Sequence, residues 1–151
     1  MMTENEILEA QQVWANGVVE IGAASDWETA RDLAQDFVQR LYVTDGSLLF
    51  KPTKARDQQF RPTVTSAVSY FVGNNSSYPE DKGFALEPWS SVRFANAGMR
   101  IDPDGIAIAM GNYFFQKSDG TEVKVEYTFG YKRFNDGLRI VLHHSALPFA
   151  G

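Results

Sequence analysis

The residues best suited to acid–base chemistry are the adjacent histidines His143 and His144, near the end of the chain. An imidazole changes charge near neutral pH, so a histidine beside a phenol or an amide can move a proton at a bound molecule. Tyr127 and Asn112 supply such groups on neighbouring apolar segments. We take His144 as the candidate catalytic residue. The alternative is a buried neutral histidine that Tyr127 or a backbone carbonyl satisfies.

The sequence gives little indication that the protein binds metal ions, phosphate groups or nucleic acids. The chain has two histidines, no cysteine and no spaced carboxylate cluster, so we expect neither a metal site nor a cofactor. It has no glycine-rich phosphate loop. A formal net charge of -5, without a run of lysine or arginine, argues against the basic surface that nucleic-acid binding requires.

The length and composition are those of a single domain spanning residues 1–151, because 44% hydrophobic residues are enough for one core. The first six residues are polar and acidic, unlike a secretory signal. No apolar run approaches the ~20 residues of a membrane-spanning helix. The absence of cysteine suits a reducing compartment. We therefore expect a cytoplasmic protein with no membrane partner.

The first half of the sequence has the apolar spacing of three amphipathic helices, with two short strands before the third. A capping box from Ser25 to Glu28 marks the start of the second helix. Apolar residues at three- and four-residue steps predict the helices, which are expected at residues 6–24, 27–42 and 62–73, with the strands around residues 47–51 and 60–61.

The second half of the sequence changes to a strand pattern rich in aromatic and branched residues. Asp119-Gly120 and Asp136-Gly137 are strong hairpin signals, since both residue types tolerate a positive φ. Helices followed by strands indicate an α+β fold, with the helices packed on one face of a curved antiparallel sheet. Four strands are expected in this sheet, at residues 91–101, 105–117, 122–134 and 138–147.

Two-residue loops at these Asp-Gly pairs would fix the register of the sheet, with Ser118 opposite Thr121 and Asn135 opposite Leu138. One face of the sheet is then largely apolar with three polar groups. We interpret this face as a ligand pocket, with a tryptophan that either covers its open end or belongs to the core. The predicted pocket residues are Met110, Asn112, Tyr127, Phe129, His144 and Trp89.

The opposite face has small residues at its centre, which allow another sheet to approach closely. A half-solvated sheet normally carries long polar side chains outward, and this face lacks them. We therefore predict a homodimer through this face, against the alternative of an exposed surface of modest polarity. The predicted interface residues are Ala109, Gly111, Tyr113, Thr128, Gly130, His143 and Ser145.

Three segments, residues 110–115, 123–131 and 140–145, resemble the nuclear transport factor 2-like superfamily. Within it they resemble the association domain of calcium/calmodulin-dependent protein kinase II and its free-standing bacterial relatives. The resemblance implies a sheet curled into a cone around three N-terminal helices, with a concave pocket. It also implies homodimers through the outer face and, in the kinase relatives, larger rings. His144 is similar in position to a histidine of the association domain. Phe129 stands where those domains place an arginine, so an anion-binding pocket does not carry over.

These observations give two functional hypotheses and leave open whether the chain is an enzyme. The first is a homo-oligomeric association domain that binds an unidentified, partly apolar small molecule. The second rests on the resemblance, because ketosteroid isomerase, scytalone dehydratase and limonene epoxide hydrolase share this fold. It is a small-molecule isomerase, dehydratase or hydrolase with His144 as the acid or base and Tyr127 or Asn112 polarising an oxygen. No carboxylate on the same face completes that arrangement.

Overall fold

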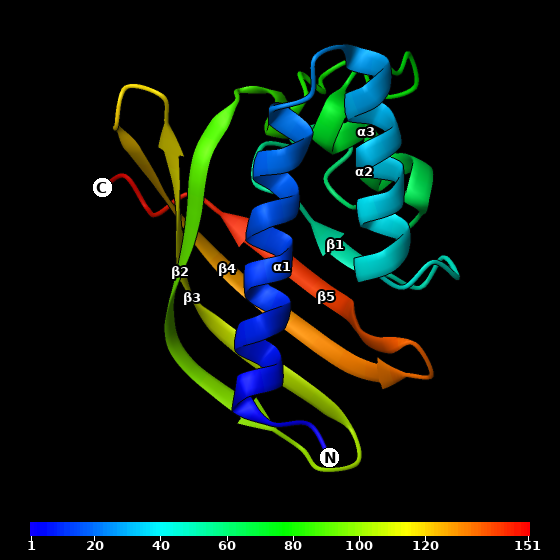
Figure 1. Ribbon diagram of the computed structural model, residues 1–151, viewed down its shortest axis with the longest axis vertical. Helices are drawn as coiled ribbons and strands as arrows, with labels where there is room; N and C mark the ends of the chain where they lie inside the picture. Colours follow the sequence, from blue (N-terminus) through cyan, green and yellow to red (C-terminus); the bar gives the residue numbers. More distant parts are fainter.

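Three helices form where the apolar spacing predicts them, and they lie on one side of a curved sheet (Figure 1). The computed structural model describes residues 1–151. A capping box between Thr3 and Glu6 begins the first helix. Asp26 caps the second helix by accepting from the Thr29 N–H at 2.8 Å, so the capping box expected at Ser25 does not form. The helices are α1 (Glu4–Gly22), α2 (Trp27–Leu41), α3 (Val64–Val72) and the short 3₁₀ helix η1 (Phe84–Leu86).

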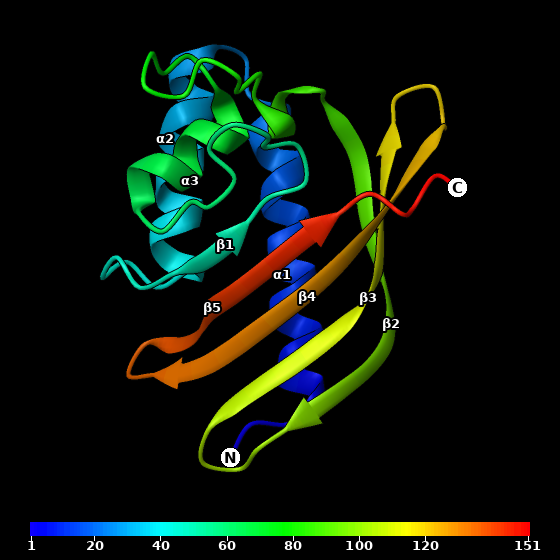
Figure 2. The ribbon, with the colours of Figure 1, turned by 180° about the vertical axis from the view of Figure 1, so that it is seen from behind.

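The sheet has five strands in the order β1-β5-β4-β3-β2 (Figure 2). β1 pairs parallel with β5, and the other pairs are antiparallel. The predicted α+β fold, a cone of sheet around three helices, is confirmed. Of the two short strands expected before α3 only the first forms, although Arg61 still donates its N–H to the Phe50 carbonyl at 2.8 Å. The strands are β1 (Leu49–Lys51), β2 (Trp89–Ile101), β3 (Ile106–Lys117), β4 (Glu122–Phe134) and β5 (Gly137–Ala146).

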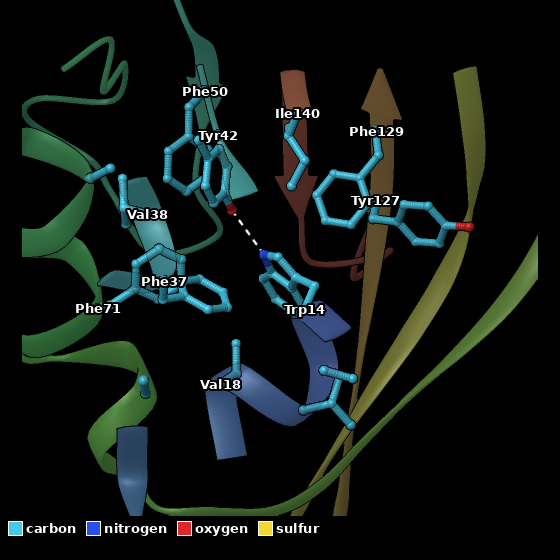
Figure 3. Packing of buried hydrophobic residues seen from close by; sticks show 14 of the residues in the cluster. Trp14, Val18, Phe37, Val38, Tyr42, Phe50, Phe71, Tyr127, Phe129 and Ile140 are labelled. Atoms are coloured by element: carbon cyan, nitrogen blue, oxygen red, sulfur yellow. Dashed lines mark hydrogen bonds between the residues drawn. The ribbon is translucent and has the colours of Figure 1, made fainter. Parts of the chain in front are cut away.

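The core between helices and sheet is built around Trp14 of α1 (Figure 3). Its ring stacks on Tyr113 of β3 at 5.5 Å and meets Phe129 of β4 edge-on at 5.7 Å. Such aromatic pairs stabilise a core beyond the area that they bury. Trp14 therefore joins α1 to the middle of the sheet. None of the helices is long and apolar enough to cross a lipid bilayer.

The hairpin between β3 and β4 differs from the predicted register by one residue. The Lys117 N–H donates to the Thr121 carbonyl at 2.8 Å, which leaves three residues, Ser118 to Gly120, in the loop. Gly120 has a φ of 91°, as expected at the last position of a three-residue hairpin loop. Since side chains alternate along a strand, this one-residue difference turns β3 over relative to β4.

The pairing of β4 with β5 also differs from the predicted register, but for another reason. The two loop residues are Asn135 and Asp136 instead of Asp136 and Gly137. This change alone would have left every side chain of β5 on its predicted face. Between Ile140 and Leu142, however, the register shifts by one residue at a bulge, opposite Gly130 and Tyr131. A bulge inserts one unpaired residue and so exchanges the two faces beyond it. His143 is consequently buried, at 2% exposed, whereas His144 faces solvent.

These two differences correct the predicted faces. Three of the predicted pocket residues lie on the outer face, namely Met110, Asn112 and His144, while the other three lie on the core side, namely Tyr127, Phe129 and Trp89. Four of the predicted interface residues are buried under the helices and cannot meet a partner, namely Ala109, Tyr113, His143 and Ser145. Thr128 and Gly130 do lie on the outer face.

Gly111, also predicted for the dimer interface, faces inward, opposite a bulge in β2. The register of β2 shifts between Asn96 and Gly98, and this brings its backbone close to Gly111. A Cβ at Gly111 would collide with the Ala95 carbonyl oxygen. The small residue at this position is therefore explained by a close approach within the sheet, not by a second chain.

Candidate functional site

The concave face of the sheet encloses a small buried cavity of about 10 Å³, between β5, β3 and α3. Apolar rings form one part of its wall, and hydroxyl groups and an imidazole form the other. A volume of this size is about that of one water probe. The lining residues are Trp14, Phe50, Pro52, Thr53, Tyr70, Phe71, Phe84, Tyr113, His143 and Ser145.

A continuous row of hydrogen bonds crosses the polar wall of the cavity. Thr53 Oγ1 and Ser145 Oγ lie 2.6 Å apart, and Ser145 Oγ lies 2.6 Å from the Tyr113 hydroxyl. The Tyr113 hydroxyl in turn lies 3.1 Å from Nε2 of His143. Strand alternation explains part of this arrangement, because His143 and Ser145 are two residues apart on β5 and share its inner face.

His143 is held from behind by a second pair of groups. Its Nδ1 lies 2.9 Å from the Tyr42 hydroxyl, which accepts a hydrogen bond from Nε1 of Trp14 at 2.9 Å (Figure 3). Phe50 of β1 stacks on the imidazole, with ring centroids 4.6 Å apart. Burial lowers the pKa of His143 well below its ordinary value, and the charge of neighbouring His144 adds to this effect. The ring is therefore neutral at neutral pH.

The two cavity tyrosines are also neutral. Burial raises the pKa of both Tyr70 and Tyr113 above the ordinary value of a phenol. The Tyr70 hydroxyl accepts the Lys54 N–H at 3.2 Å. The cavity therefore presents hydroxyl groups and a neutral imidazole, and none of its lining side chains carries a charge.

A larger cleft of about 280 Å³ lies outside the cavity and shares Tyr70 and Phe84 with it. These two rings stack with their centroids 5.5 Å apart and line both the cavity and the cleft. The cleft is lined by two lysines, Lys54 and Lys82, and by three carboxylates of opposite charge. Trp89, predicted for the open end of the cone, lines this cleft and donates from its Nε1 to the Phe84 carbonyl at 2.8 Å.

A buried ion pair holds the loop that borders the cleft. The Arg61 guanidinium, fully buried, donates two hydrogen bonds of 2.8 Å to the Asp81 carboxylate. Asp81 also accepts from the Ser69 hydroxyl at 2.6 Å. Since Ser69 precedes Tyr70 on α3, this ion pair ties the loop before η1 to the helix that carries a cavity residue.

The polar groups of the predicted catalytic trio, Asn112, Tyr127 and His144, do not converge. The Tyr127 hydroxyl turns inward to Asn96 and to Gln11, whose Nε2 donates to it at 3.2 Å. All three residues of the trio, Asn112, Tyr127 and His144, border an open hollow of about 400 Å³ on the outer face of the sheet, but the Tyr127 hydroxyl lies on the other side. Asn112 donates to the Val125 carbonyl at 3.3 Å. Throughout the structure, no three His, Cys, Asp or Glu side chains are grouped so that they could hold a metal ion.

Sequence reasoning missed the two cavity residues with hydroxyl groups that lie outside the sheet. Thr53 follows β1 in an irregular loop, and Tyr70 lies within an apolar helix, so neither stands out from its neighbours. The remaining polar residues were noticed but were placed on the wrong face. The alternation His143-x-Ser145 was the available signal for a shared polar face.

Comparison with known proteins identifies relatives over nearly the whole chain. The family model for metal-independent carbonic anhydrase matches residues 5–147. A metal-independent carbonic anhydrase from Nostoc sp. (strain PCC 7120) is 38% identical over an alignment of 154 positions, which covers 98% of this chain and 75% of that protein. A crystal structure of the iota-carbonic anhydrase from a cyanobacterium, in complex with bicarbonate, has a TM-score of 0.95 and 36% identity, and the match covers 99% of this chain and 94% of that one.

More distant structures share the fold alone. A calcium/calmodulin-dependent protein kinase II association domain from Xanthomonas campestris has a TM-score of 0.65 at 19% identity, over 100% of this chain and 91% of that one. A nuclear transport factor 2-like protein from Shewanella oneidensis has a TM-score of 0.58 at 16% identity, over 96% of this chain and 99% of that one. The predicted nuclear transport factor 2-like fold is therefore confirmed.

The two predicted functions are corrected by these comparisons. The role of an association domain with an undefined ligand is wrong, because the family model, the Nostoc protein and the bicarbonate complex are all those of carbonic anhydrases. The isomerase, dehydratase or hydrolase based on His144 is set aside for the same reason.

Proposed function

This chain belongs to the metal-independent carbonic anhydrase family, and we propose that it interconverts carbon dioxide and bicarbonate in the cavity beside Ser145. The observation that carries the proposal is a buried cavity with apolar rings on one side and a hydrogen-bonded row of hydroxyls and an imidazole on the other. The apolar part suits carbon dioxide, and the polar part suits water and bicarbonate.

Hydration joins the oxygen of a water molecule to the carbon of carbon dioxide, moves one C=O electron pair onto oxygen and releases one proton. Negative charge therefore develops on the substrate oxygens. Hydroxyl donors at fixed positions stabilise such charge without reorganising, and they do so more strongly where water is excluded. Thr53 and Tyr70 are hydroxyl groups that border the cavity and could donate to these oxygens, and Ser145 lies directly behind Thr53.

The small volume of the cavity implies a movement during the reaction. About 10 Å³ holds one water molecule, whereas bicarbonate has four heavy atoms. The wall between cavity and cleft consists of the Tyr70 and Phe84 rings, which are side chains and can rotate. We expect one of these rings to turn outward when substrate enters from the cleft.

The proposal predicts that the purified protein accelerates carbon dioxide hydration after exhaustive treatment with a chelator. The measurement is stopped-flow hydration with a pH indicator, accompanied by metal analysis of the same sample. The expected result is an unchanged kcat in metal-free protein. Hydration at the uncatalysed rate, both before and after addition of zinc, would disprove the proposed activity. Activity that is lost with the metal and restored by zinc would contradict the metal-independent mechanism.

We also propose that the chain self-associates through the outer face of the sheet. β3 exposes Ile106, Ile108 and Met110 on this face, where a solvated sheet would carry polar residues. Thr128 and Gly130, two of the residues predicted for a dimer interface, lie beside them on β4. A higher ring and a cytoplasmic location stay predictions from the sequence.

Self-association predicts a dimer by size exclusion with light scattering. Met110→Lys would place a charge in the middle of the outer face, so we expect that variant to be a monomer. Leu8→Lys, at an exposed apolar residue of α1, is the matched control and should leave the dimer intact. A monomeric unmodified protein would contradict the proposal.

A further inference from the structure

We infer that Trp14 and Tyr42 are positioning residues that set the direction of the hydrogen-bonded row from His143 to Thr53, so that Thr53 presents its hydrogen to the substrate beside that of Tyr70. The inference deepens the proposed carbonic anhydrase activity, and its catalytic consequence rests on that activity. The hydrogen-bond directions themselves follow from the geometry alone and can be tested separately.

The direction begins at Trp14, because an indole N–H can donate but cannot accept. The Tyr42 hydroxyl is fully buried and has two partners, Nε1 of Trp14 and Nδ1 of His143. Since buried hydroxyl hydrogens find acceptors and Trp14 offers none, the Tyr42 O–H donates to Nδ1. Nδ1 of His143 is therefore an acceptor.

Because His143 is neutral, an accepting Nδ1 also determines what its other ring nitrogen, Nε2, does. Burial keeps the imidazole neutral by lowering its pKa, and a neutral ring with an accepting Nδ1 bears its hydrogen on Nε2. That N–H donates to the Tyr113 hydroxyl. Tyr113 must then donate to Ser145, and Ser145 must donate to Thr53.

Two hydroxyl hydrogens remain at the end of this row. Thr53 Oγ1 already accepts from Ser145, so its own hydrogen is not used within the row, and its neighbour on the remaining side is the Tyr70 hydroxyl. The Tyr70 oxygen accepts the Lys54 N–H, so its hydrogen is also free. Both residues line the cavity. The site therefore offers two convergent donors, which suit the oxygens of a developing bicarbonate.

The same directions assign a role to His143 and exclude another. Neither ring nitrogen has a lone pair available to the cavity, because Nδ1 accepts from Tyr42 and Nε2 bears the hydrogen donated to Tyr113. Reversing the row would leave the Tyr42 hydroxyl hydrogen buried without an acceptor. His143 therefore orients the hydroxyl groups but does not take the proton of the attacking water.

The tautomer of His143 is the direct test. His144→Gln leaves His143 as the sole histidine, so its two ring nitrogens can be assigned in long-range ¹H–¹⁵N spectra of labelled protein. We expect a pyridine-type Nδ1 and a pyrrole-type Nε2, with no change across neutral pH. A pyrrole-type Nδ1, or an imidazolium at neutral pH, would overturn the inference. If the expected tautomer accompanies a protein without hydration activity, the directions stand and the proposed function fails.

Tyr42→Phe tests the effect on catalysis. Removing the Tyr42 hydroxyl takes away the only group that donates to Nδ1 of His143 and so makes it an acceptor. We expect signals of both tautomers and a kcat about tenfold lower at unchanged KM, the effect of misdirecting about one hydrogen bond. Tyr131→Phe is the matched control, because the Tyr131 hydroxyl is buried without a hydrogen-bond partner. It should preserve both the tautomer and kcat. A single Nε2–H tautomer together with full kcat in Tyr42→Phe would contradict the positioning role.

Discussion

Replacing Ser145 by alanine is expected to lower kcat for carbon dioxide hydration by about 10²–10³-fold, because Thr53 loses the group that orients its hydroxyl and no longer acts as a fixed donor to developing negative charge. Ser145 Oγ lies 2.6 Å from both Thr53 Oγ1 and the Tyr113 hydroxyl, so its loss interrupts the row at its centre. The Thr53 hydroxyl would then accept no hydrogen bond from Ser145, so the direction of its own hydrogen would no longer be fixed. Stopped-flow hydration on Ser145→Ala measures the effect.

The matched control for this variant is Ser118→Ala. Ser118 is an exposed serine in the loop between β3 and β4, so the same chemical change occurs far from the cavity. Both variants should retain the circular dichroism spectrum of the unmodified protein. A kcat for Ser145→Ala equal to that of Ser118→Ala would place the reaction outside this cavity.

The architecture could be predicted because it depends on patterns that extend over many residues. The three helices and the long strands each repeat their apolar spacing several times, so a local irregularity does not hide them. The faces of β3 and β5 depend on single residues instead. Gly120 adds one residue to a hairpin loop, and the bulge before Leu142 adds one to β5. Neither Asp-Gly pair distinguishes a two-residue loop from its alternatives.

The site was hidden for a related reason. Its strand residues, His143 and Ser145, were visible, but the incorrect face made them look like part of a subunit contact. Thr53 and Tyr70 come from a loop and a helix that only the folded chain brings to β5. A search for charged residues also fails here, because the cavity has none. The lack of an arginine on the pocket strands argued against an anion-binding pocket. That inference does not hold, since hydroxyl groups at fixed positions can also stabilise negative charge.

Breaking the buried ion pair beside the cleft should have the largest effect on stability. Asp81→Ala leaves the Arg61 guanidinium buried without its carboxylate, and removing one partner of such a pair costs about 3–5 kcal/mol. Urea unfolding followed by circular dichroism measures the free energy of unfolding. Arg31→Ala is the control, because its ion pair with Asp32 is exposed and should contribute less than about 1 kcal/mol.

A double variant separates the burial of charge from the loss of packing. Replacing both partners, as in Arg61→Met with Asp81→Leu, removes the uncompensated charge, so we expect it to recover a large part of the stability lost in Asp81→Ala. Asp81 also accepts from Ser69, next to Tyr70, so the double variant should still lose activity even where it regains stability. If Asp81→Ala were no less stable than Arg31→Ala, the ion pair would not hold this loop. A stable double variant with full activity would show that the wall of the cavity is held by its own aromatic packing instead.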